Sequence, residues 1–118
     1  METQEASQRS QRQFEALFES AVSALLVVDG RGFSLQGYEE GFYLAPTLID
    51  RVTPQMKSYQ DEIFGPVLSI IGYKSIDEAI QIANDSDFGL AGYIQGKDPE
   101  TIAKIARGLR VGQVVINH

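Results

Sequence analysis

The sequence predicts an α/β fold, in which a βαβαβ segment with a mostly parallel sheet follows an N-terminal amphipathic helix. Three observations lead to this class. Short apolar runs alternate with helical patterns of apolar residues through the C-terminal half. The connections between them are short, as in βαβ units. The 118 residues are 43% hydrophobic and 22% charged, which suffices for one domain with an apolar core.

The N-terminal region is predicted to contain a lead-in and one helix. Residues 1–13 are polar, rich in Gln and Ser and without aromatic side chains, which predicts a disordered lead-in before a single domain over residues 14–118. An amphipathic helix is then expected over residues 14–22, because apolar residues recur on one helical face. These residues are Phe14, Leu17, Phe18, Ala21 and Val22.

The middle of the chain carries weaker signals. Residues 25–28 form an apolar run that a turn-forming Asp-Gly pair ends, which predicts a strand. The Gly-rich, polar residues 31–41 are expected to form a loop. Residues 42–49 favour an extended conformation, but Pro46 cannot donate to a sheet ladder and therefore indicates an edge or irregular strand. A short helix is expected to end near Tyr59.

The C-terminal half has clear boundaries. Three apolar runs predict strands, over residues 67–73, 91–95 and 113–116. Ser75 is a good N-cap with Glu78 three residues later, the spacing of a capping box, and the helix that it begins should end near Asn84. Asp98 precedes Pro99, which combines an N-cap with a proline in the first helical turn and predicts a second helix.

The composition excludes several kinds of site. The chain contains no cysteine, so it can form neither disulfides nor thiolate metal sites and has no cysteine nucleophile. Its single histidine, His118, excludes a histidine-based triad or metal cluster. A net charge of −6 argues against nucleic-acid binding. No apolar run approaches the ~20 residues needed to span a membrane, and we expect a protein of the reducing cytoplasm.

The stretch before the strand at residue 67 is the candidate site. Glu62 and Phe64 directly precede Gly65-Pro66, which leads into that strand, and a loop at a strand end is a common place for ligand contacts. An ionised glutamate accepts two hydroxyl hydrogen bonds, which is how a ribose diol is held. An aromatic ring two residues on can cover a planar base. The alternative is a packed Phe64 beside a surface Glu62.

Several motifs in this order resemble a segment of the aldehyde dehydrogenase superfamily. They are Pro46-Thr47, Glu62-Ile63-Phe64-Gly65-Pro66-Val67, Glu78-Ala79-Ile80, Ala83-Asn84, Phe88-Gly89-Leu90-Ala91, Gly112 and Asn117. The resemblance runs from about Leu26 to the C-terminus. Two further stretches, residues 29–33 and 38–41, are most similar to the methylmalonate-semialdehyde dehydrogenase branch.

The resemblance implies part of an oxidoreductase that uses NAD or NADP to oxidise aldehydes. By position in the family motif, Glu62 binds the nicotinamide ribose, Phe64 lies against the nicotinamide side, and Asn117 lies near the substrate side. The family's catalytic cysteine, its general-base glutamate, its oxyanion-hole asparagine and its Rossmann-type dinucleotide domain have no counterpart in this chain. We therefore expect no catalytic residue, no metal and no aldehyde oxidation by the chain alone.

Two alternatives remain. Residues 14–33 are also similar to the opening of a PAS sensor domain, a helix that leads into a first strand, so a sensor fusion is possible. The chain could instead be a small α/β interaction or oligomerisation module without enzymatic activity. In that case an exposed sheet edge or the N-terminal helix would mediate self-association.

Overall fold

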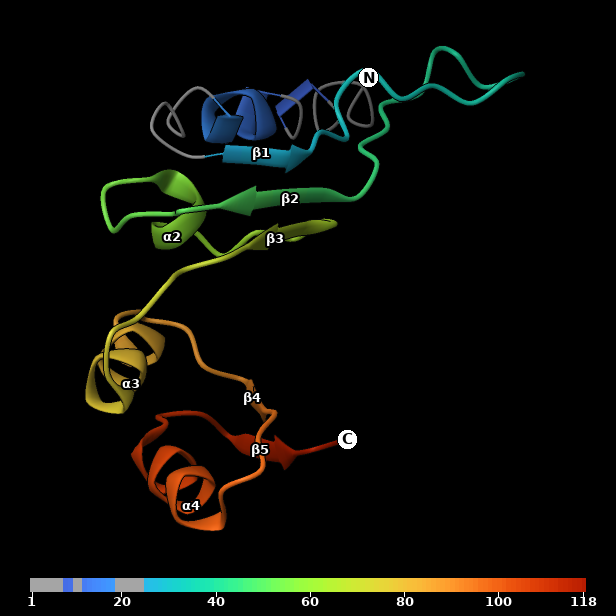
Figure 1. The fold of residues 1–118 in the computed structure, drawn as a ribbon. Helices are drawn as coiled ribbons and strands as arrows, with labels where there is room; N and C mark the ends of the chain where they lie inside the picture. Colours follow the sequence, from blue (N-terminus) through green and yellow to red (C-terminus); the bar gives the residue numbers. More distant parts are fainter. Residues whose placement is uncertain (1–7, 10–11, 19–24) are drawn as a thin grey trace. The chain divides into compact units, whose positions relative to one another are not determined.

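The structure is a computed structural model that describes residues 8–9, 12–18 and 25–118. The chain divides into a first unit that ends at Gly72 and a second unit, Tyr73–His118 (Figure 1). Both units combine helices with a parallel pair of strands, which confirms the predicted α/β class.

The first unit contains a three-stranded sheet. Its strands are β1 (Leu25–Val28), β2 (Thr47–Asp50) and β3 (Val67–Ser69), and they lie side by side in the order β1-β2-β3 (Figure 1). β1 is antiparallel to β2, whereas β3 is parallel to it. The predicted strand over residues 67–73 is shorter in the structure because its partner β2 ends at Asp50, after which Arg51 adopts a left-handed φ of 59°.

The prediction of an edge or irregular strand over residues 42–49 was wrong. β2 is the central strand of the sheet, with a neighbour on each side. Pro46 lies just before β2, so the N–H that it lacks falls outside the hydrogen-bond ladder. The first donor of the strand is the Thr47 N–H, which bonds the Pro66 carbonyl at 2.8 Å.

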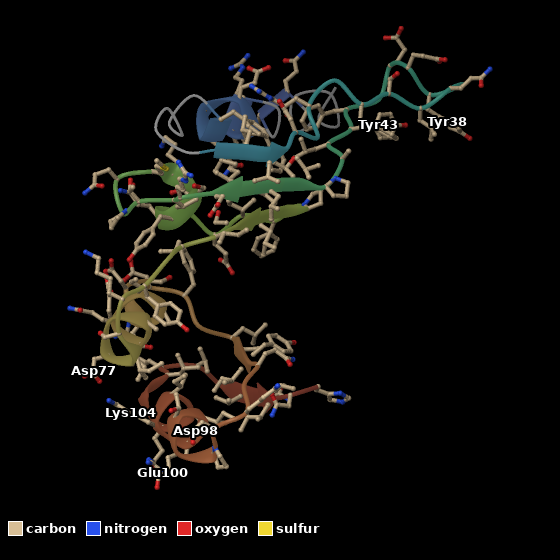
Figure 2. All side chains as sticks on the ribbon, in the orientation of Figure 1. Tyr38, Tyr43, Asp77, Asp98, Glu100 and Lys104 are labelled. Atoms are coloured by element: carbon tan, nitrogen blue, oxygen red, sulfur yellow. The ribbon has the colours of Figure 1, made fainter. Side chains whose placement is uncertain are left out.

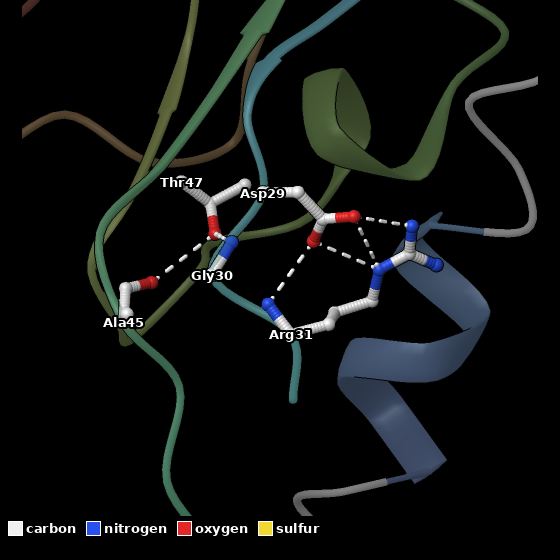
Figure 3. Close-up of polar contacts among 5 residues, drawn as sticks. All are labelled: Asp29, Gly30, Arg31, Ala45 and Thr47. Atoms are coloured by element: carbon white, nitrogen blue, oxygen red, sulfur yellow. Dashed lines mark hydrogen bonds and ion pairs between the residues drawn. The ribbon is translucent and has the colours of Figure 1, made fainter. Parts of the chain in front are cut away.

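A close turn follows β1 and is fastened to β2 (Figure 3). The Gly30 N–H donates to the Thr47 hydroxyl at 3.0 Å, and this hydroxyl donates to the Ala45 carbonyl at 3.2 Å. The Ala45 N–H returns a hydrogen bond to the Gly30 carbonyl at 3.1 Å. A Cβ atom at residue 30 would lie 1.9 Å from the Ala45 oxygen, so the close approach of the two chain segments requires glycine.

An ion pair stands at the same turn (Figure 3). The Arg31 guanidinium makes a two-pronged contact with the Asp29 carboxylate, with Nε–Oδ1 at 2.9 Å and Nη2–Oδ2 at 2.6 Å. On its other side the guanidinium lies 4.4 Å from the centre of the Phe18 ring. Hydrogen bonds from the Arg31 side chain and the Arg31 backbone N–H lower the pKa of Asp29 from 3.8 to about 2.

The core of the first unit lies between the sheet and two helical segments. Its buried residues are Leu17, Ile49, Val52 and Met56. Ile49 of the central strand is fully buried, and Leu17 reaches the core from the helical residues 12–18. Met56 begins the short helix α2 (Lys57–Gln60), which confirms the helix expected near Tyr59.

The predicted N-terminal helix is confirmed in part. Residues 12–18 are helical, and residues 19–22 of the prediction lie outside the described residues. Of the predicted lead-in, residues 8–9 and 12–13 are helical, and the remainder also lies outside the described residues.

The second unit is a strand–helix arrangement in which the predicted local signals are confirmed. Its elements in chain order are α3 (Ile76–Asn84), β4 (Ala91–Ile94), α4 (Pro99–Gly108) and β5 (Gln113–Ile116). β4 and β5 form a separate two-stranded parallel sheet. Ser75 accepts a hydrogen bond from the Glu78 N–H at 3.1 Å, and Asp98 accepts one from the Thr101 N–H at 2.9 Å, so both predicted N-caps are formed.

The two helices of the second unit are joined at their C-terminal ends by Asn84. Its side-chain N–H donates to the Gly108 carbonyl at 2.8 Å, and its Oδ1 accepts the Arg110 N–H at 2.8 Å. An exposed ion pair between Asp77 and Lys104, 2.7 Å apart, links the same helices elsewhere (Figure 2). Asn84 thus satisfies backbone groups that a helix end leaves without partners.

We predict that the Asp29 carboxyl titrates at about pH 2 in the folded chain. Because the folded pKa lies below the unfolded value of 3.8, the stabilisation is complete above pH 3.8 and is lost as the pH falls towards 2. The pair is exposed, so its contribution to the free energy of unfolding is about 0.2–1 kcal/mol. Carboxyl-detected NMR titration measures the midpoint. Arg31→Met should return the pKa of Asp29 towards 3.8. An unchanged midpoint in this variant would contradict the Arg31 side chain as the cause of the lowered pKa.

Candidate functional site

The loop of residues 61–66 joins α2 to β3 and is held at both ends by backbone hydrogen bonds. At its start, the Asp61 N–H donates to the Lys57 carbonyl at 2.9 Å. At its end, the Pro66 carbonyl accepts the Thr47 N–H of the central strand at 2.8 Å. A loop fixed in this way can present its side chains without further ordering when a ligand binds.

Successive side chains of this loop point to different surroundings. Ile63 is partly buried and packs against the core of the first unit. Glu62 is exposed, and Phe64 leaves 85% of its surface in contact with solvent. The interpretation of Phe64 as a packed core residue is therefore wrong. Ile63 anchors the loop, and the two candidate residues on either side of it remain available to a ligand.

A cavity of about 250 Å³ opens beside the loop. Its lining residues are Gln13, Phe14, Leu17, Asp61, Glu62, Ile63 and Phe64. Apolar walls with a few polar groups are typical of ligand sites, whose volumes are usually ~300–1,000 Å³. At about 250 Å³, this cavity lies just below that range.

Sequence reasoning missed three residues of this cavity. The polar composition of residues 1–13 predicts that Gln13 lies in the disordered lead-in, and the apolar period identifies Phe14 and Leu17 only as part of one helix face. The helical period identified that face correctly, but no local signal could show that the helix end lies against a loop some fifty residues further along the chain.

Asn117, predicted on the substrate side, lies in the second unit and has a structural role there. It follows β5 in a left-handed conformation, with φ 51°. Its Oδ1 accepts the Gly96 N–H at 2.8 Å, and its own N–H donates to the Ile94 carbonyl at 2.8 Å. The side chain therefore fastens the end of β5 to the segment after β4. Its role towards a substrate stays a prediction.

Nowhere in residues 8–9, 12–18 and 25–118 do three or more Asp, Glu or His side chains gather closely enough to hold a metal ion. None of the helices in this part of the chain has both the length and the apolar character of a membrane-spanning segment.

The described residues thus form an α/β fold in which the loop of residues 61–66 presents an exposed carboxylate and an exposed aromatic ring beside a small cavity. The aldehyde dehydrogenase family model matches residues 4–118. A Staphylococcus aureus (strain USA300) protein assigned as an aldehyde dehydrogenase is 54% identical over 82 residues, which are 70% of this chain and 17% of that protein. The chain thus belongs to the aldehyde dehydrogenase family, and it spans about a sixth of the length of this relative.

Solved structures of the family contain the same arrangement of elements. A Sinorhizobium meliloti protein assigned as a methylmalonate-semialdehyde dehydrogenase, solved with NAD, superposes with a TM-score of 0.83 at 36% identity and covers 92% of this chain and 23% of its own. A variant of aldehyde dehydrogenase C from Pseudomonas syringae, solved with NAD+ and octanal, gives a TM-score of 0.79 at 40% identity, over 93% of this chain and 23% of its own.

The structural role of Asn117 can be tested by two substitutions. Asn117→Gly keeps the left-handed backbone and removes the acceptor, which should lower the free energy of unfolding of the second unit by about 0.5–1.5 kcal/mol. Asn117→Ala should cost about 1 kcal/mol more, because alanine disfavours that backbone conformation. Urea unfolding followed through the amide signals of β4 and β5 measures both. Equal stability of the two variants would contradict this role.

Proposed function

We propose that this chain supplies the loop that binds the nicotinamide ribose of NAD(P) in an aldehyde dehydrogenase. The observation that carries the proposal is the placement of Glu62 and Phe64, both exposed, beside a cavity of about 250 Å³. The Glu62 carboxylate would accept hydrogen bonds from the two ribose hydroxyls. The exposed ring of Phe64 would cover one side of the nicotinamide. Relatives of the same fold solved with NAD support this assignment.

The proposed contribution is binding and orientation, and aldehyde oxidation is not expected of this chain alone. The sequence has no cysteine and so cannot provide the thiolate that the family resemblance implies as the nucleophile. The bound cofactor would accept the hydride from the aldehyde carbon. Glu62 and Phe64 would fix the position of the ring that receives it, which contributes through orientation. Asn117 would lie near the aldehyde or semialdehyde, whose other contacts would come from residues that this chain does not contain.

Titration with nicotinamide mononucleotide and NAD tests the role of Glu62. At millimolar ligand we expect chemical-shift changes confined to the amides of residues 61–66 and of the helical residues that line the cavity, and no response to AMP. Glu62→Gln keeps the size of the side chain and removes its charge, so the dissociation constant should rise about tenfold, because hydrogen bonds to charged groups contribute about 1.5–3 kcal/mol.

Glu40→Gln is the matched control, since Glu40 is exposed and lies outside the cavity lining. It should bind both ligands like the unchanged chain. A loop that is indifferent to NAD and to nicotinamide mononucleotide, or an unchanged response in Glu62→Gln, would rule out the proposed role.

A second candidate function is self-association, favoured by an apolar groove on the sheet of the first unit. The groove has a volume of about 400 Å³ and runs over all three strands. Val28, Leu48 and Leu68 are neighbours in the strand register, and Val28 and Leu68 are 50% and 62% exposed. A second copy of the chain could cover this apolar surface.

Sedimentation equilibrium over a range of concentrations tests this alternative. The weight-average mass should rise with concentration, and Leu68→Lys should lower it by placing a charge in the groove without disturbing the core. Leu90→Lys is the control, because Leu90 is 87% exposed in the second unit. A monomer at all concentrations would exclude self-association.

A further inference from the structure

The ring of Phe14 is in close contact with the glycine of the candidate loop. A Cβ atom added to Gly65 would lie 2.7 Å from Phe14 Cζ and 3.1 Å from Cε1. Real Cβ atoms do not approach other atoms at the shorter of these distances, so the ring occupies the space that a side chain at residue 65 would need. The tip of Phe14 therefore rests directly on the backbone of the loop.

The conformation of Gly65 does not by itself require glycine. Among the described glycines only Gly32 and Gly37 have a positive φ. Gly65 lies in a region of backbone conformation that other residues also adopt. A side chain at this position would instead meet the ring of Phe14.

Phe14 is itself held from two sides. Leu17 and Phe18, which follow it in the helical residues 12–18, are 4% and 8% exposed and fix the helix on the first unit. The ring of Phe42 lies 6.1 Å from the Phe14 ring, centre to centre, at a tilt of 32°. Phe14 also lines the cavity that contains Glu62 and Phe64. It therefore connects a packed helix to the loop that carries the candidate site.

We propose that Phe14 is a positioning residue of the cofactor site, which acts through Gly65 to hold the loop of residues 61–66. With the ring in place, Glu62 and Phe64 keep their positions at the cavity in the absence of ligand. Without it, the loop keeps its backbone anchors at the two ends and the packing of Ile63 on the core, but it loses the support at Gly65. This inference rests on the proposed function, and it adds the helix of residues 12–18 to the parts of the chain on which cofactor binding depends.

Phe14→Leu and Gly65→Ala test the contact from both sides. Phe14→Leu removes the ring and retains an apolar side chain, whereas Gly65→Ala displaces the ring and leaves Phe14 intact. Each should speed amide hydrogen exchange in the loop about tenfold without ligand, because local opening becomes easier. Each should also raise the dissociation constant for nicotinamide mononucleotide several-fold. The double variant that carries both Phe14→Leu and Gly65→Ala should show less than the sum of the two single effects, because the smaller leucine leaves room for the methyl group of the alanine.

Phe18→Leu is the matched control, because Phe18 lies in the same helix, is buried, and contacts Arg31 instead of the loop. It should lower global stability while exchange in the loop, relative to the rest of the unit, stays unchanged. If Phe14→Leu and Gly65→Ala do no more than Phe18→Leu, the positioning role is overturned.

The ligand-free exchange measurement separates this inference from the proposed function. If Phe14→Leu and Gly65→Ala speed exchange only in the loop, but the unchanged chain binds no nucleotide, Phe14 positions the loop and the cofactor assignment is wrong. Nucleotide binding that depends on Glu62 but is unaffected by Phe14→Leu and by Gly65→Ala would support the cofactor assignment and overturn the positioning role of Phe14.

Discussion

The buried Thr47 holds three segments of the first unit together, and the candidate site depends on it. Its hydroxyl receives the Gly30 N–H and bonds the Ala45 carbonyl, which fixes the turn after β1. Its backbone N–H bonds the Pro66 carbonyl, which fixes the end of the loop that carries Glu62. Because Thr47 is only 3% exposed, the loss of one partner would leave a polar group unsatisfied away from water. The Pro46-Thr47 motif thus has a structural role in the first unit.

Local signals explain why the second unit could be predicted almost residue by residue. Ser75 and Asp98 begin their helices through hydrogen bonds to residues three positions on, and such contacts can be read directly from the sequence. The first unit depends on contacts between distant segments, and there the predictions failed at particular points. Pro46 suggested an edge strand because its position relative to the ladder could not be known. The approach of Phe14 to Gly65 likewise arises only from tertiary packing.

Family membership and catalytic capacity are separate properties of this chain. The motif loop, its anchors and the cavity beside it all belong to one unit, so the proposed nicotinamide contacts need no residue from elsewhere for their geometry. The cysteine nucleophile that the family resemblance implies for the chemical step is different, because the sequence contains no cysteine. The proposed role of this chain is therefore confined to binding, through the loop and the cavity beside it. Any affinity of this part alone should be low, because the cavity has room for only a portion of a dinucleotide.

The exposed apolar surface of the first unit is of two chemical kinds, which favours two different occupants. Phe64 stands next to a carboxylate and a small cavity, an arrangement that suits a planar ring attached to hydroxyl groups. The groove around Leu68 is lined almost entirely by apolar side chains and has no charged group to orient a small ligand. Only the hydrophobic effect of covering apolar surface would drive binding to that groove, and a protein partner offers more apolar surface for this than a nucleotide does. Cofactor binding at the loop and association through the groove therefore rest on different chemistry, and the two surfaces meet at the loop, because Gly65 and Pro66 line the groove.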